Sequence, residues 1–194
     1  AQRGKKFYRR SSTVIYPPVE VEKIIQELRS VVSHPLGIHT HNDGDCAVIN
    51  SLVAVREGAV QVQGTINGVG ERCGNANLVS IIADLELKLG VSCLPEGGLL
   101  KLYDISHLVD EVANITPNDH QPYVGRSAFA HKGGVHVAAV RRSAQSYHHT
   151  HPEYVGNKMR VVVSDLSGRG NILSKAEESG LDIGSNETVV GILN

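Results

Sequence analysis

Apolar positions near the start of the chain recur every three to four residues, which is the spacing of one face of a helix. Between residues 19 and 32 these positions are Val21, Ile24, Ile25, Leu28 and Val32. Pro17 and Pro18 stand just before them, and proline is favoured in the first turn of a helix. The pattern therefore predicts a helix over 19–32.

Four further segments alternate between the strand and the helix pattern. Residues 35–41, "PLGIHTH", open with proline and are too few for a helix, so we expect a strand. Residues 59–65, "AVQVQGT", alternate and are rich in valine, which predicts a second strand. Residues 45–58 run from an aspartate that can cap a helix to a glycine that can end one, and 75–90 predict another helix. This order is typical of parallel βα units, in a doubly wound sheet or a (β/α) barrel.

The alternation changes after residue 90. Residues 94–115 predict a turn followed by one helix, and 116–125 are a linker rich in Pro, Asn and Gly. Beyond the linker lie two stretches rich in Gly and His, and 172–180 predict a last helix. We therefore expect a domain boundary in the linker.

Charge and cysteine content narrow the classes of partner. The net charge is -1, and the only basic cluster lies at the start of the chain, so no basic face for nucleic acid is expected. Three cysteines without C-x-x-C spacing argue against a disulfide framework or a thiolate zinc site. The sequence has no apolar run long enough to span a membrane and no signal-peptide core. We expect no membrane partner and a cytoplasmic location.

The first candidate site is a pair of histidines, His39 and His41, at the end of the strand predicted over 35–41. Residues i and i+2 of a strand project to the same face, so both imidazoles can reach one ion. Ten histidines make a chance H-x-H pair common, and a second pair occurs at His149 and His151. No strand leads into that second pair, and we expect it to be solvated.

A third ligand is available in "NGVGERCGNANL", residues 67–78, where glycines permit close backbone approach and Asn75 offers a side-chain oxygen. Two imidazoles and an oxygen suit a catalytic divalent ion such as Zn, Mn, Co or Mg. The alternative is a pair of hydrogen-bonded histidines at a strand end. Glu71 and Arg72 of the same stretch could form a buried pair or line the pocket.

Four segments carry a resemblance to a known family. They are "GIHTHND", "GAVQVQGTINGVGERCGNANL", "SAFAHKGGVHVAAV" and "VVVSDLSGRGNIL". Together they resemble the family of α-isopropylmalate, homocitrate and citramalate synthases, and are most similar to its bacterial citramalate synthase branch. The resemblance runs from about residue 35 to at least 181.

The resemblance implies a partial (β/α)₈ TIM barrel followed by a small, mostly helical linker region. Residues 1–115 would be the carboxyl-end portion of the barrel, with its last βα units. Residues 116–160 would be linker subdomain I, and 161–194 the start of linker subdomain II. The family also implies a homodimer in which the linker crosses to the partner subunit.

The resemblance assigns roles to five residues of this sequence. His39 and His41 match the metal ligands on a strand, and Asn75 matches the ligand on the following loop. His136 and Tyr147 match a linker histidine and a linker tyrosine that reach the partner's active site and handle protons. No substrate-binding residue can be assigned.

The implied reaction is a metal-dependent, Claisen-type condensation of pyruvate with acetyl-CoA, which gives citramalate and CoA on the route to isoleucine. A first alternative is a 2-isopropylmalate or homocitrate synthase, which differs in the α-keto acid. A second alternative is a non-catalytic remnant that binds metal or a full-length subunit.

Several features depart from the family pattern. The family's amino-terminal Arg-Asp motif and its catalytic glutamate have no match in this chain. Gly44 and Asp45 replace a small residue and a glycine, and His151 stands where an Asp is usual. A complete barrel needs about 250 residues, so we expect a fragment or truncated form whose activity alone is in question.

Overall fold

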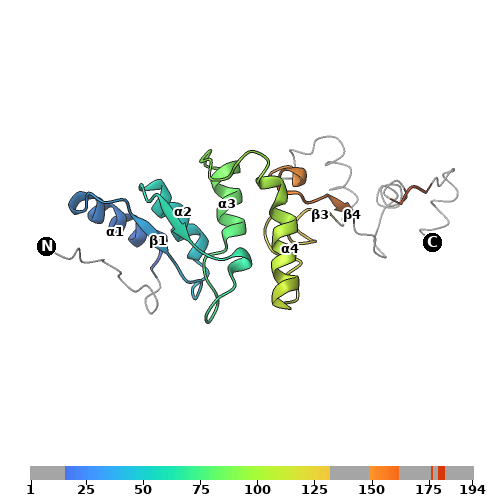
Figure 1. The fold of residues 1–194 in the computed structure, drawn as a ribbon, viewed down its shortest axis with the longest axis horizontal. Helices are drawn as coiled ribbons and strands as arrows, with labels where there is room; N and C mark the ends of the chain where they lie inside the picture. The colour runs from blue at the N-terminus through green and yellow to red at the C-terminus, as the bar shows by residue number, and fades with distance from the viewer. Residues whose placement is uncertain (1–15, 132–148, 162–175, 177–178, 182–194) are drawn as a thin grey trace. The chain divides into compact units, whose positions relative to one another are not determined.

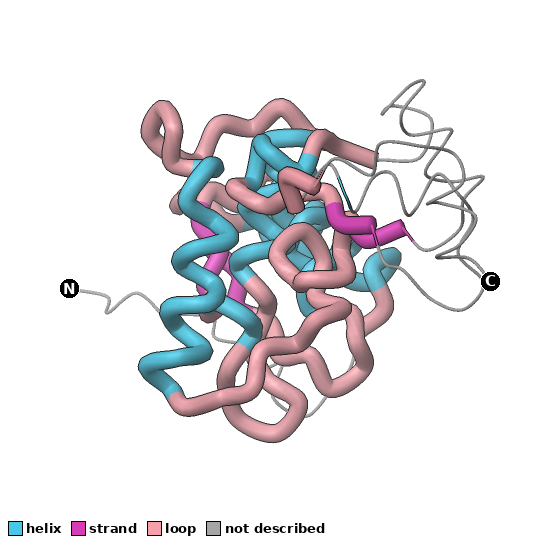
Figure 2. The backbone as a smooth tube through the Cα atoms, turned by 90° about the vertical axis from the view of Figure 1, so that its right-hand side faces the viewer, coloured by secondary structure: helices cyan, strands magenta, loops and turns pink. Residues whose placement is uncertain are grey.

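The computed structural model describes residues 16–131, 149–161, 176 and 179–181. The chain forms two compact units, residues 1–93 and 94–194, and each is described by itself. Figure 2 shows that the strands are short and that loops make up much of the described chain. Within the described ranges, no helix combines the length and apolar character needed to cross a membrane.

The first unit consists of alternating helices and short strands (Figure 1). Its two strands pair in parallel, with Ile38 opposite Val62, and a helix connects them. This is a βα crossover, as the sequence predicts. The elements are α1 (Pro18–Val31), β1 (Gly37–His39), α2 (Ala47–Arg56), β2 (Gln61–Gln63), the 3₁₀ helix η1 (Ile66–Gly68) and α3 (Leu78–Leu87).

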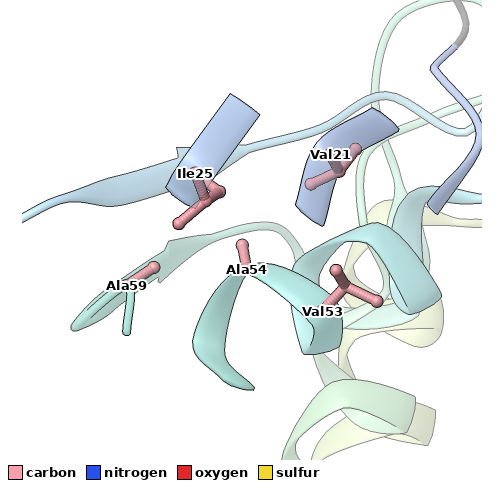
Figure 3. Close-up of a cluster of buried hydrophobic side chains, with 5 residues drawn as sticks. All are labelled: Val21, Ile25, Val53, Ala54 and Ala59. Carbon is pink, nitrogen blue, oxygen red and sulfur yellow. The ribbon is translucent and has the colours of Figure 1, made fainter. Parts of the chain in front are cut away.

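One apolar cluster packs α1 against α2 (Figure 3). It contains Val21, Ile25, Val53, Ala54 and Ala59. The two residues from α1 belong to the face that the helical spacing predicts, so the prediction for 19–32 is confirmed. The small alanines let α1 and the end of α2 approach closely, and the packed helices support the strand that carries the histidines.

A second cluster packs α3 against α2. Its buried members are Ala47, Ala76, Ile81 and Leu85. Ala47 opens α2 and Ala76 lies just before α3. The same cluster therefore anchors the chain segments that follow His41 and Asn75.

The start of α2 differs from the prediction. Asp45 does not cap the helix; it lies at φ 56, in the left-handed region, and accepts a hydrogen bond from Asn42 Nδ2. The N-cap residue is Cys46, whose side chain makes no capping bond; Asn42 Oδ1 instead accepts from the backbone N–H of Ala47, the first residue of the helix (3.1 Å). The prediction that a glycine ends this helix is confirmed, since Gly58 follows the C-cap with φ 100.

The second unit contains η2 (Leu99–Lys101), α4 (Leu102–Ala113), β3 (Ala130–His131), η4 (Pro152–Val155) and β4 (Arg160–Val161). The turn and single helix expected over 94–115 are confirmed. Strands β3 and β4 pair in parallel. The helix expected over 172–180 falls mainly outside the described residues, and the domain boundaries at 115 and 160 stay predictions.

Candidate metal centre

The end of β1 brings His39 and His41 together. β1 ends at His39, and His41 continues the extended path as an isolated bridge to Asn75. Their Nε2 atoms lie 3.3 Å apart, within hydrogen-bond distance, so the alternative of two hydrogen-bonded histidines fits this geometry as well. The two rings meet edge to face with centroids 5.1 Å apart. The alternation of an extended chain therefore aims both imidazoles at one point, as the sequence predicts.

The residue between the two histidines holds the strand in place. Thr40 is 7% exposed and points away from the imidazoles, toward α2. Its Oγ1 donates to the carbonyl oxygen of Ala47 (3.0 Å) and lies 3.1 Å from Ser51 Oγ. These buried contacts fix the orientation of the strand end, because a rotation that moved the histidines would break them.

Asn75 faces His41 across a short antiparallel contact. Its Nδ2 donates to the carbonyl oxygen of Val69 (3.2 Å). Its Oδ1 is buried and has no hydrogen-bond partner among the described residues, and the same holds for His41 Nδ1. Buried polar atoms without partners are costly and uncommon in native proteins. The amide oxygen of the residue opposite His41 thus adds an unmatched donor to the two imidazoles, and all three are of the kinds that bind divalent cations.

Glycines let the loop before Asn75 fold tightly around it. A Cβ at Gly70 would collide with the Asn75 side chain, and a Cβ at Gly74, which has φ 103, would collide with the backbone of Gly68. The expectation that glycines permit close approach of the backbone in this loop is confirmed.

The structure contains an ion pair next to the histidines that the sequence pattern does not predict. Arg72 Nε and Nη2 donate to the two carboxylate oxygens of Asp43, both at 2.8 Å. This bidentate bond holds the pKa of Asp43 below its usual range. Glu71 is not part of a buried pair, since its side chain is 85% exposed and lies 3.7 Å from Arg72. The opposite charges in "HND" and "GER" were a signal that could have suggested the contact.

The residues present fit a divalent ion. Within the described ranges no group of three or more His, Cys, Asp or Glu side chains could hold a metal. A site formed from the described residues would combine the two histidines with an amide oxygen, and Asn75, which stands opposite His41, carries an unmatched one. Three ligands that leave other positions open suit a catalytic ion. The roles of His39, His41 and Asn75 as metal ligands stay predictions.

Two other histidines contact aromatic rings in the second unit. His149 is exposed, as expected, and its ring centroid lies 5.1 Å from that of Tyr123. The His151 ring lies 5.3 Å from that of Tyr154. His136 and Tyr147, the predicted catalytic residues, lie outside the described residues.

Comparisons with known proteins match most of the chain. An HMGL-like family model matches residues 7–109, and a model described as homocitrate synthase post-HMGL domain-like matches 123–191. An (R)-citramalate synthase from Geobacter sulfurreducens is 60% identical over 172 residues, which cover 89% of this chain and 33% of that protein. A 2-isopropylmalate synthase from Methanocaldococcus jannaschii is 39% identical over 163 residues, covering 84% of this chain and 31% of that protein.

One solved structure is similar at lower identity. An HMG-CoA lyase from Acenitobacter baumannii, in complex with coenzyme A and 3-methylmalate, is 24% identical, with a TM-score of 0.46. The match covers 54% of this chain and 36% of that chain. The chain spans about a third of the length of the curated relatives it matches.

Proposed function

The chain belongs to the HMGL-like family, and on this basis we propose that it is a part of an (R)-citramalate synthase, which spans the carboxyl-end portion of the catalytic barrel and the linker that follows it. Such an enzyme condenses pyruvate with acetyl-CoA and releases citramalate and CoA. The observation that carries this choice is the 60% identity to the Geobacter enzyme over 89% of the chain. The lower identity of 39% to a 2-isopropylmalate synthase makes that reaction the second candidate.

Membership of this family confirms the predicted fold class, a partial (β/α)₈ barrel. The parallel pair β1–β2, with α2 as its crossover and α3 after it, supplies βα units of such a barrel. Active sites of these barrels lie at the carboxyl ends of the strands. His39 ends β1, and the loop that carries Asn75 follows β2. The position of the candidate site, at the carboxyl ends of β1 and β2, supports the proposal.

The chemistry would depend on a divalent ion, which we propose to be Zn, Mn, Co or Mg. Once bound, the ion would polarise the keto group of the α-keto acid and stabilise the negative charge that develops on its oxygen. His39 and His41 would each offer a neutral imidazole nitrogen, and Asn75 its amide oxygen. Thr40 would keep the strand end in register, so that these donors need little rearrangement on binding.

The proton transfers would involve the linker. A base removes a proton from the acetyl methyl group, the resulting carbanion bonds to the keto carbon of pyruvate, and hydrolysis of the thioester releases CoA. His136 suits the base because an imidazole titrates near neutral pH, and Tyr147 suits a proton donor. In the proposed homodimer these two residues act in the partner's active site.

The cellular setting follows from the same proposal. The substrates would be acetyl-CoA and pyruvate, within isoleucine synthesis, and neither nucleic acid nor a membrane would be a partner. Cys46, Cys73 and Cys93 are free thiols, which supports a reducing cytoplasmic location.

The test is a pair of chimeras. In one, this chain replaces its matching region in the Geobacter citramalate synthase; in the other, it replaces the matching region of the Methanocaldococcus enzyme. CoA release is followed with pyruvate, 2-oxoisovalerate or 2-oxoglutarate, with and without divalent ions. We expect metal-dependent activity with pyruvate in the first host and little activity in the second.

Two variants sharpen the result. His39→Ala should abolish the activity of the first chimera, whereas His149→Ala should leave it intact. Activity only in the second host, with 2-oxoisovalerate, would replace the citramalate assignment by the 2-isopropylmalate one. Inactivity of both chimeras, when both hosts are active, would favour a non-catalytic remnant.

A further inference from the structure

Two loops that are distant in sequence meet at the candidate metal centre and are joined by one ion pair. Asp43 lies two residues after His41, and Arg72 lies three residues before Asn75. Both carboxylate oxygens of Asp43 accept from the guanidinium, each at 2.8 Å, across a separation of 29 residues. A bidentate pair of this kind constrains direction as well as distance.

The ion pair extends a short backbone ladder. The N–H of Ala76 donates to the carbonyl oxygen of Thr40 (3.1 Å), and the N–H of Asn42 donates to that of Gly74 (2.9 Å). These two bonds flank the position where His41 and Asn75 stand opposite each other. The Asp43–Arg72 pair lies immediately beyond the second bond. It therefore ties the two loops together at that end of the ladder, where the Asp43 carboxylate also accepts a hydrogen bond from the backbone of Cys73.

The backbone at Arg72 indicates that its side chain has a specific role. Arg72 has φ 57, in the left-handed region, which is uncommon for a residue with a side chain. Glycine adopts this conformation without strain, and the loop uses glycine at several neighbouring positions. An arginine here costs conformational free energy, and its two-point bond to Asp43 is the contact that acts against this cost.

The Arg72 guanidinium already contacts two carboxylates, those of Asp43 and Glu71. Nε and Nη2 bond to Asp43, and Nη1 lies 3.7 Å from a carboxylate oxygen of Glu71. Recognition of an anionic substrate would require these groups to separate, so the arrangement favours a positioning role over substrate binding. Arg56, by contrast, makes one contact each to Glu22 and Glu57, and neither contact joins the two loops of the candidate site.

We propose that the Asp43–Arg72 pair is a positioning device, which holds the Asn75 loop against the two histidines and thereby raises the affinity for the divalent ion. This inference rests on the metal site of the proposed function. The pair does not touch the ion; it acts through the backbone ladder that sets Asn75 opposite His41.

The test measures metal binding rather than activity. The 194-residue chain is stripped with EDTA, and its affinities for Mn²⁺ and Co²⁺ are measured by titration calorimetry. We expect Arg72→Gln and Asp43→Asn each to raise Kd by about 10- to 100-fold, the range found when residues that orient metal ligands are altered. The double variant should bind about as weakly as the weaker single variant, because each single change already breaks the ion pair.

Further variants separate positioning from general stability. Arg72→Lys keeps the charge but not the two-point geometry, and should recover little affinity. Arg56→Gln removes an exposed arginine of the same unit and should bind metal normally. The absorption spectrum of bound Co²⁺ should change with Arg72→Gln, since one ligand is displaced, and should stay unchanged with Arg56→Gln.

These measurements distinguish failure of the positioning role from failure of the metal site itself. Wild-type Kd values and spectra in Arg72→Gln and Asp43→Asn would overturn the positioning role and leave the metal site standing. If Arg72→Gln does not fold, the Kd and the Co²⁺ spectrum of the isosteric Asp43→Asn variant test the positioning role. If the unaltered chain binds no better than His39→Ala, the metal site itself fails, and the positioning role fails with it.

Discussion

Two asparagines of the same loop, Asn75 and Asn77, should respond in opposite ways to replacement by alanine. The Oδ1 of Asn75 is buried and without a hydrogen-bond partner among the described residues. The Oδ1 of Asn77 accepts from the backbone N–H of Val79 (3.0 Å) and caps α3. The same substitution thus removes an unmatched oxygen at one position and a helix cap at the other.

The expected change in the free energy of unfolding for each variant follows from these contacts. Asn75→Ala loses the bond from Nδ2 to Val69 (3.2 Å), a loss of about 1 kcal/mol. It also removes a buried unpaired oxygen, whose burial costs about 1–3 kcal/mol. Without metal, the free energy of unfolding should therefore stay unchanged or rise by up to about 2 kcal/mol. Asn77→Ala should lower it by about 0.5–2 kcal/mol, the usual cost of losing a cap.

The assay is urea unfolding followed by circular dichroism, in EDTA and in excess Mn²⁺. An ion at 100 times its Kd stabilises a folded protein by about 2.7 kcal/mol. We expect this gain in wild type and in Asn77→Ala, and its loss in Asn75→Ala. A gain that persists in Asn75→Ala would refute the ligand role. If Asn75→Ala lowers the free energy of unfolding by well over about 1 kcal/mol in EDTA, burial of the unmatched Asn75 oxygen does not destabilise the metal-free protein.

Three further outcomes follow from the described residues. Ile81 is 1% exposed, and Ile81→Ala should lower the free energy of unfolding by about 2–5 kcal/mol in urea titrations, whereas Ile49→Ala, at a 44% exposed site, should change it little. A hydrogen bond from Gln26 lowers the pKa of Glu57 from its usual value of 4.5, so the ionised carboxylate stabilises the folded state. Glu57→Gln should therefore be less stable than wild type at about pH 7. In thermal melts this difference should disappear as the pH falls below about 4.5, because the carboxylate then becomes protonated. Asn157→Ala leaves the backbone carbonyls of Tyr123 and Gly125 without their donor. It should lower the free energy of unfolding by about 2–4 kcal/mol, and an unchanged melting temperature would contradict this.

The sequence predicted the elements of the first unit because their signals are local. The helical spacing before residue 32 predicted α1, and the valine alternation predicted the strand that contains β2. The start of α2 was less predictable, since both Asn42 and Asp45 are favoured capping residues. The turn places Asp45 at φ 56, which leaves Asn42 to reach the helix. Local propensity does not distinguish two such candidates three residues apart.

The sequence by itself determined that His39 and His41 share a face, because the two-residue period of an extended chain does not depend on the rest of the fold. Only the tertiary structure decided that Asn75 stands opposite His41 and that Arg72 bonds to Asp43. These contacts join loops about 30 residues apart in sequence, and their register is set by the parallel pairing of β1 with β2 and by the backbone bonds between the two loops. A pattern of residue types carries no information on that register until the strands are paired.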